Sequence, residues 1–336
     1  MDYSGIRRIK DAATRRQIID SLGRLRAGLA EDVPIKSPSN LLLASRNIRE
    51  FGGSRYGGRT KEAIYCIAEC LNHFDLIAVQ EVRSDLAALK EVMGLLGPQW
   101  DVVYNDVSYA DGGNHERLAF LFNRGKVTFS GLAGEIVLPS KRASALMSQL
   151  ARSPFVCGFQ AGWAKFNLCT VHIYYGKGVR NDKRRVDEIG ALAELLADKA
   201  KDYVDIKHKV VYSPENLVLL GDFNIFSRAD ATFKALIDNG FVVPKALQSL
   251  PGSNVAHDKF YDQIAFYENV VGVQCIRAGV FDYYKYVFKD ERRYRNAKPA
   301  RAKFKDWRTY QMSDHLIMWS QFDVDKTEAY LDSLAT

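Results

Sequence analysis

Several features that would place a chain in a special class are missing from these 336 residues. No apolar run approaches the roughly 18 residues of a membrane-spanning helix, and no apolar stretch follows the basic start, as it would in a secretory signal. The five cysteines are odd in number, scattered and mostly inside apolar segments, which indicates buried thiols in a reducing compartment rather than a disulfide framework. We therefore expect an intracellular, cytoplasmic protein without a membrane span.

The signatures of several enzyme classes are also missing. The chain has no G-x-x-x-x-G-K-S/T loop, no G-x-S-x-G elbow and no Cys/His cluster with zinc spacing. The usual motifs of a P-loop nucleotide site, a serine hydrolase and a structural zinc site are therefore absent. A large excess of one charge is missing too, because 47 Lys+Arg against 40 Asp+Glu give only +7. That value alone fits either an acidic partner or a merely basic surface.

What is present is an alternation of short apolar strands and amphipathic helices, which predicts a layered α/β protein. The predicted strands are 40–46, 76–80, 100–105, 117–123, 165–174, 216–220, 263–267 and 316–322, and the predicted helices are 60–72, 85–96, 183–201 and 229–239. The first 30 or so residues predict a further helix, which Pro34 and Pro38 end. We expect an N-terminal helical extension at 1–38, a main domain at 39–325 and a C-terminal tail at 326–336.

One segment carries the whole net charge. Residues 285–308 hold ten Lys or Arg and three acids, so the other 312 residues balance to zero. Aromatic residues between Tyr283 and Trp307 are interleaved with these cations. Such cations would contact phosphates without reading sequence, and the rings could stack on bases. The alternative is a solvated loop that its aromatic residues anchor to the sheet.

Polar side chains stand at or near the ends of the predicted strands, where a pure core would not need them. They are Asn47, Glu81, His172, Asp222, Asn224, Asp314 and His315. Each alone has an ordinary explanation as a turn residue, a cap or a buried histidine, but their joint occurrence is much less expected by chance. Carboxylate and amide oxygens suit Mg²⁺, and two histidines on separate strands can handle protons at both ends of a displacement. The combination predicts metal-assisted hydrolysis of a phosphate ester.

These residues fall in motifs that occur together in one known family. The motifs are R-N-I-R-E-F-G (46–52), L-I-A-V-Q-E-V-R (76–83), H-E-R-L-A-F-L-F (115–122), T-V-H (170–172), L-L-G-D-F-N (219–224), Y-D-Q-I (261–264) and S-D-H (313–315). By their order over residues 40–322 the chain resembles the endonuclease/exonuclease/phosphatase superfamily, and within it the deoxyribonuclease I branch. The resemblance implies a four-layer αββα sandwich of two mixed β-sheets with helices outside.

The resemblance also implies a metal and phosphate site. Glu81 and Asn47 would hold Mg²⁺, or Mn²⁺, with Asp314 assisting. Asp222 and Asn224 would bind the scissile phosphate and position the attacking water.

Two histidines receive roles from the same resemblance. His315, oriented by Asp262, would contact the phosphate or take a proton from water, and His172, paired with Glu116, would be the acid to the leaving oxygen. The physics agrees, because a neighbouring carboxylate stabilises imidazolium and fixes its tautomer.

The expected substrate contacts are arginines. Arg49 stands where apurinic-site endonucleases of the superfamily have an acid, and it would face the phosphate backbone. Arg117 of H-E-R is a further expected contact. The basic segment would contribute Arg292, Arg293, Arg295 and Arg301. Asn114 replaces the family's groove-binding aromatic residue, and the N-terminal helix has no evident family counterpart.

The leading hypothesis is a Mg²⁺-dependent endonuclease that hydrolyses DNA, rather than RNA, with little sequence specificity. Two alternatives remain open. One is a phosphoinositide phosphatase or sphingomyelinase-like phosphodiesterase of the same superfamily, since a basic segment also suits anionic lipid. The other is a non-catalytic nucleic-acid-binding module, against which the costly buried charges argue. We expect the N-terminal helix to contact a partner or a second copy of the chain.

Overall fold

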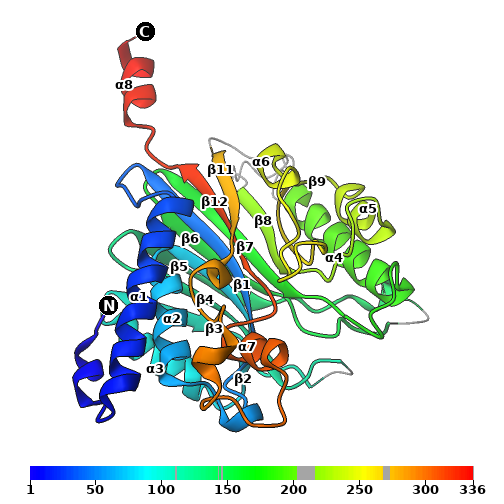
Figure 1. The fold of residues 1–336 in the computed structure, drawn as a ribbon. Coiled ribbons are helices and arrows are strands. Elements are labelled where there is room, and N and C mark those ends of the chain that lie inside the picture. Colours follow the sequence, from blue (N-terminus) through cyan, green and yellow to red (C-terminus); the bar gives the residue numbers. More distant parts are fainter. Residues whose placement is uncertain (110–111, 143, 145–146, 203–215, 268–272, 336) are drawn as a thin grey trace.

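The computed structural model describes residues 1–109, 112–142, 144, 147–202, 216–267 and 273–335, which form four layers (Figure 1). Two six-stranded β-sheets pack face to face, and helices cover their outer faces. Each sheet contains one parallel pair of strands among antiparallel ones. The predicted αββα sandwich of two mixed sheets is therefore confirmed.

The first sheet has the order β11-β12-β1-β2-β4-β3, in which β1 and β2 are parallel. Its strands are β1 (Asn40–Phe51), β2 (Leu76–Arg83), β3 (Trp100–Tyr104), β4 (Glu116–Asn123), β11 (Gln274–Phe281) and β12 (Ile317–Asp323).

The second sheet has the order β5-β6-β7-β8-β10-β9, in which β7 and β8 are parallel. Its strands are β5 (Val127–Glu135), β6 (Phe155–Ala161), β7 (Ala164–His172), β8 (Asn216–Asp222), β9 (Phe241–Val242) and β10 (Asp262–Tyr267).

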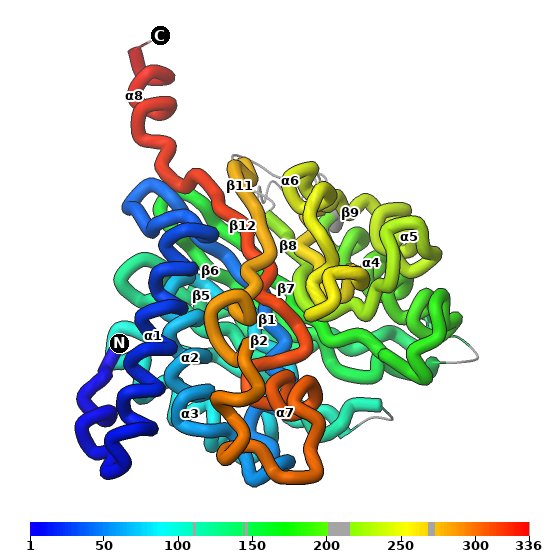
Figure 2. Tube along the Cα trace, in the orientation of Figure 1, coloured from blue at the N-terminus to red at the C-terminus, as the bar shows by residue number. Residues whose placement is uncertain are grey.

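The helices divide between the two outer faces. On the side of the first sheet lie α1 (Ala12–Asp32), α2 (Lys61–Asn72), α3 (Ala87–Leu96) and α7 (Phe304–Gln311). On the side of the second sheet lie α4 (Lys183–Asp202), α5 (Ala231–Ile237) and α6 (Lys245–Gln248). The last helix, α8 (Thr327–Ala335), projects from the body (Figure 2). Within the described residues, no helix combines the length and the apolar character needed to cross a membrane.

Short 3₁₀ turns complete the chain, at η1 (Ser4–Arg8), η2 (Arg55–Gly57), η3 (Ser140–Arg142), η5 (Tyr283–Lys285) and η6 (Glu291–Tyr294).

The sequence of strand β1 is apolar without alternation because both faces of the strand are buried. Leu41 and Leu43 belong to the cluster between the two sheets, whereas Leu42 and Ala44 belong to the cluster under α1 and α2. All four are fully buried, as expected of a strand that is covered on both faces. The central strands therefore form a rigid base for the residues at their ends.

All eight predicted strands are present, but the prediction missed β5, β6, β9 and β11. Most residues of β5 and three of the eight residues of β11 are exposed, because both are edge strands. A strand without a regular buried face lacks the alternation by which a sequence reveals it. Helix α1 begins after the N-cap Asp11 and places Leu25 and Leu29 in the cluster that α2 and β1 share.

The basic segment corrects one expectation. Tyr283, Tyr294 and Trp307 are at most 2% exposed and belong to the core under the first sheet, so the idea that the interleaved rings stack on bases is wrong for them. Tyr286 packs against α1, where Gly28 leaves room for its ring, and donates to Asp32 at 2.9 Å. Removal of these apolar rings from water is favourable. The rings therefore anchor the segment to the first sheet.

Candidate active site

Polar residues of both sheets meet where the two parallel strand pairs end. Asn47 and Glu81 lie near the ends of β1 and β2, and His172 and Asp222 end β7 and β8 as register partners. Asp262, the first residue of β10, pairs in register with Asp222 on its other side. Glu81, His172 and Asp222 line a cleft of about 780 Å³, within the usual range for small-ligand sites.

Asn47 connects the two sheets. Its Nδ2 donates to Glu81 Oε1 at 2.9 Å and to Asp222 Oδ2 at 3.0 Å. Its Oδ1 is buried and has no hydrogen-bond partner among the described residues. A buried amide oxygen without a partner is costly, so this atom is available to a ligand.

Glu81 is placed by an irregularity in β2. The pairing of β2 with β4 shifts between Val79 and Val82, and Glu81 has a φ of +63°. The left-handed region costs a non-glycine residue about 1–2 kcal/mol, and such strain clusters at functional sites. The backbone N–H of Glu50 donates to Glu81 Oε2 at 2.8 Å. Burial and the nearby Glu116 raise the pKa of Glu81. The ionised carboxylate of Glu81 is therefore destabilised where no cation is near it.

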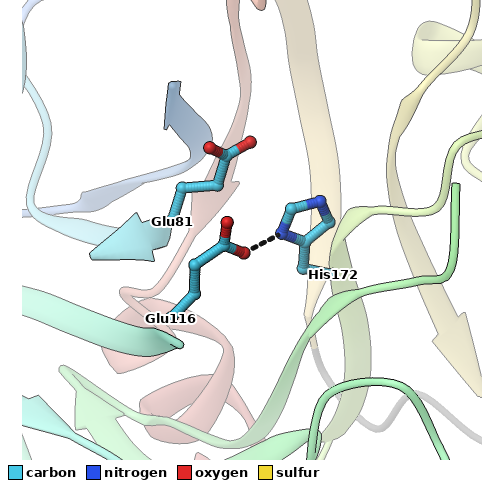
Figure 3. A group of neighbouring side chains, drawn as sticks. All are labelled: Glu81, Glu116 and His172. Atoms are coloured by element: carbon cyan, nitrogen blue, oxygen red, sulfur yellow. Dashed lines mark ion pairs between the residues drawn. The ribbon is translucent and has the colours of Figure 1, made fainter. Parts of the chain in front are cut away.

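His172 lies between the carboxylates of Glu116 and Asp222, and Figure 3 shows it beside Glu116. Its Nδ1 is 3.2 Å from Glu116 Oε2, and its Nε2 is 3.5 Å from Asp222 Oδ2. The buried Arg152 donates from Nε to the same Glu116 oxygen at 2.8 Å. Burial opposes the charge on Glu116, but His172 and Arg152 outweigh burial and lower the pKa of Glu116 to about 2. A permanently charged Glu116 fixes the orientation of the imidazole.

His315 is the counterpart on the other side of Asp222. Its Nδ1 is hydrogen-bonded to Asp262 Oδ2 at 2.9 Å, and its Nε2 is 3.5 Å from Asp222 Oδ2. Burial disfavours an imidazolium here, but Asp262 and Asp222 outweigh burial and raise the pKa of His315 well above its usual value. The side chain is therefore more readily protonated than an ordinary histidine, and its Nε2 faces Asp222.

Two further motif residues complete the cleft. Asn224 has a φ of +53°, its backbone N–H donates to Asp222 Oδ1 at 2.9 Å, and its Nδ2 donates to the carbonyl of Ile173 at 2.8 Å. Asp314 is half-exposed, and its Oδ2 is 3.8 Å from Nε of Arg49. Asp222 is thereby held from several sides, and Asp314 faces the open part of the cleft.

Comparison with known proteins identifies the fold. No protein-family model and no curated protein matches the sequence. Among solved structures, an endonuclease/exonuclease/phosphatase from Bacteroides vulgatus matches with a TM-score of 0.52 at 14% identity, over 85% of this chain and 100% of that one. The chain has the endonuclease/exonuclease/phosphatase fold.

Other proteins of similar fold have different described substrates. A mannosyl-6-phosphatase from Bacteroides thetaiotaomicron matches with a TM-score of 0.53 at 18% identity, over 84% of this chain and 99% of that one. D. rerio TDP2, complexed with a single-strand DNA product, matches with a TM-score of 0.53 at 13% identity over the same shares. At such identities the likeness concerns the endonuclease/exonuclease/phosphatase fold alone.

The donor atoms of the cleft are suited to a divalent cation. Oxygen or nitrogen donors of Glu81, Glu116 and His172 lie within 4.8 Å of one another, and the unpartnered Oδ1 of Asn47 is a further hard donor. The expected metal set was Glu81, Asn47 and Asp314, all of which line or adjoin this cleft. Carboxylate and amide oxygens match what Mg²⁺ prefers.

The expected arginines do not all meet at the cleft. Arg49 lines it, but Arg117 donates to the carbonyl of Asn105 and pairs with Asp106 outside the cleft lining. The four arginines that were expected from the basic segment also lie outside the cleft lining: Arg292, Arg293, Arg295 and Arg301. Arg293 donates to the carbonyl of Gln17 in α1 at 3.1 Å. Contacts from this segment would therefore need a substrate that extends beyond the cleft.

Sequence reasoning missed several cleft residues, among them three arginines and Tyr175. Arg152, Arg83 and Arg55 supply positive charge, and Tyr175 supplies an exposed ring. The signal available for Arg152 was a lone arginine in A-R-S-P-F, directly before an apolar strand. Arg83 ends β2 after its register shift, and Arg55 and Tyr175 lie outside the strands and long helices, so periodicity does not give the direction of their side chains.

Proposed function

We propose that this chain is a divalent-metal-dependent phosphodiesterase that hydrolyses nucleic acid, DNA rather than RNA. One observation carries the proposal: Oδ2 of Asp222 is 3.5 Å from Nε2 of both His172 and His315, and each histidine is backed by its own carboxylate. Two imidazoles on opposite sides of one carboxylate can handle protons on both sides of a phosphorus centre.

The reaction follows from what these side chains can do. The backbone N–H of Asn224 orients Asp222. Asp222 accepts a proton from the attacking water while the oxygen of that water bonds to phosphorus. His315 donates from Nε2 to a phosphate oxygen and stabilises the negative charge that develops there. His172, held by Glu116, gives a proton to the leaving oxygen as the phosphorus–oxygen ester bond breaks. One water is consumed, and a phosphate monoester and an alcohol are formed.

The metal would be held by Glu81 and Asn47, with Asp314 assisting. When bound, Mg²⁺ or Mn²⁺ supplies positive charge beside the phosphate. The cleft favours a bound cation, because burial and the carboxylates of Glu116 and Asp314 raise the pKa of Glu81. A cation in this place would relieve the repulsion between them.

Two features support a nucleic-acid substrate. Arg49, Arg55 and Arg83 line the cleft, and cations in such positions contact phosphates without reading bases. The similar D. rerio TDP2 fold is described with a single-strand DNA product. The mannosyl-6-phosphatase of similar fold supports a phosphomonoesterase as the second candidate.

The test is cleavage of plasmid and of labelled single-stranded oligonucleotides by the purified protein in Mg²⁺ or EDTA. We expect cleavage in Mg²⁺, none in EDTA, and a loss of about 10²–10⁴-fold in His172→Gln. The matched control is His73→Gln, since His73 follows α2 and bonds the carbonyl of Pro34 outside the cleft.

Three outcomes would contradict the proposal. Equal cleavage by wild type and His172→Gln would show that the activity comes from elsewhere. Release of inorganic phosphate from sugar or inositol phosphates without cleavage of DNA would favour the phosphatase. Retention of DNA that EDTA does not change, without turnover, would indicate a binding module.

A further inference from the structure

Three aromatic rings form a cluster on one side of the cleft. Tyr175 follows β7, Phe226 follows β8, and Tyr261 precedes β10. The ring centroids are 6.3 Å apart for Tyr175 and Phe226, 5.5 Å for Phe226 and Tyr261, and 6.4 Å for Tyr175 and Tyr261. The Tyr175 and Phe226 rings are close to parallel, at 20°. We call these three residues the aromatic wall.

The aromatic wall adjoins the catalytic residues. Tyr175 and Tyr261 line the same cleft as His315 and Asn224. The ring of Tyr261 lies 5.4 Å from the imidazole of His315, centroid to centroid. Tyr175 remains 45% exposed, although a ring of this size gains free energy by burial. Aromatic rings that line a cleft are typical contacts for a ligand.

The aromatic wall is also fixed in place. The buried Arg185 donates to the carbonyls of Tyr174, Tyr175 and Val179, which holds the loop that carries Tyr175. Its guanidinium carbon lies 5.1 Å from the Phe226 ring centroid, and Nζ of Lys259 lies 5.2 Å from the same ring. Cations near a ring are attracted to its π-face. The wall is therefore arranged before a ligand binds, which lowers the entropic cost of binding.

Other residues that line the cleft have a different chemistry. Arg55, Arg83 and His115 line it, and Arg83 donates to the carbonyl of Asn114 at 2.9 Å. Asn114 and His115 both have a φ of +57°, a strained arrangement that turns this loop sharply before Glu116. The cleft thus offers charged groups for phosphates as well as the planar rings of Tyr175 and Tyr261.

We propose that the aromatic wall is a subsite for an unpaired nucleobase, carried by the nucleotide whose phosphate lies at Asp222 and His315. This inference rests on the proposed function and specifies its substrate. A base within a duplex has both faces covered by its neighbours, whereas an unpaired base can stack on Tyr175 or Tyr261. The chain therefore prefers single-stranded or locally unpaired nucleic acid.

The experiment compares two ligands of equal charge: a fluorescent oligothymidylate and an oligomer of abasic spacers with the same number of phosphates. Binding is measured by anisotropy in EDTA, and cleavage in Mg²⁺. We expect wild type to bind the oligothymidylate about tenfold more tightly, because stacking of one base contributes roughly 1–3 kcal/mol. Tyr175→Leu should lose this preference, Tyr175→Phe should keep it, and the control Tyr330→Leu should keep it, since Tyr330 is 49% exposed on α8, outside the cleft lining.

The outcomes separate this inference from the proposed function. Equal binding of both ligands by wild type, or an equal loss for both ligands in Tyr175→Leu, would overturn the nucleobase subsite even if cleavage occurs. Base-dependent binding that Tyr175→Leu abolishes would support the subsite even if no cleavage is found, and only the hydrolytic proposal would then fail.

Discussion

Asn47 and Asp222 meet across the two sheets. Nδ2 of Asn47, in β1 of the first sheet, donates to Oδ2 of Asp222, at the end of β8 in the second, at 3.0 Å. The same nitrogen donates to Glu81. One amide therefore lies between two carboxylates and fixes the distance between the two halves of the site.

Asn47→Asp tests this bridge. A third carboxylate would replace a donor between Glu81 and Asp222, so we expect the free energy of unfolding to fall by about 3 kcal/mol. The loss should be larger at pH 8 than at pH 5, because protonation relieves the repulsion. Chemical denaturation at both pH values measures it, and Asn296→Asp at an exposed position is the control. An equal loss at both pH values would contradict the electrostatic explanation.

Metal binding predicts a linked change in stability. Mg²⁺ at a hundred times its dissociation constant should raise the free energy of unfolding by about 3 kcal/mol, since the ion binds only the folded site. Glu81→Gln should abolish both this rise and activity. Glu91→Gln, which removes an exposed partner of Lys61, should retain both. Scanning calorimetry with and without Mg²⁺ measures the effect, and an unchanged rise in Glu81→Gln would place the metal elsewhere.

The charge on His315 predicts a pH dependence. Asp262→Asn removes the carboxylate that offsets the effect of burial on His315, so the pKa of His315 should fall. Activity should then drop about tenfold or more at pH 8 but less at pH 6. Because the folded-state pKa of His315 is raised, its contribution to stability is complete below about pH 6.5. That contribution is lost as pH rises through the folded value, and the variant should show a flatter dependence of stability on pH.

Rate and melting temperature against pH measure this effect. Asp282→Asn is the matched control, because Asp282 faces His257 at 3.2 Å in a pair outside the cleft lining. If Asp262→Asn lost the same activity at every pH, Asp262 would act only by positioning the ring.

Glu188 predicts a stabilised variant. Burial raises its pKa to about 7, above the value of about 4.3 in an unfolded chain. The folded protein therefore holds a proton that the unfolded chain releases, and stability falls as pH rises between these values. Glu188→Gln should raise the free energy of unfolding at pH 8 by about 3 kcal/mol and change little at pH 4. The exposed Glu328→Gln is the control, and a pH-independent gain would refute this account.

Much of the fold could be predicted from local patterns. The apolar runs of β1, β2, β7 and β8 identified the central strands, and the polar residues at their ends identified the site. The edge strands β5 and β11 escaped prediction because their exposed residues follow no regular alternation. Arg152 escaped because its partner, Glu116, is 36 residues away, and no local pattern pairs them.

The sequence by itself determined the central strands, the polar residues at the strand ends and the place of the charge, because each is a local pattern. Only the tertiary structure decided where the basic segment lies. Most of its rings are buried against the first sheet, since burial is set by neighbours distant in the chain. The aromatic wall likewise exists only because three loops meet, and the same holds for the amide of Asn47 between its two carboxylates.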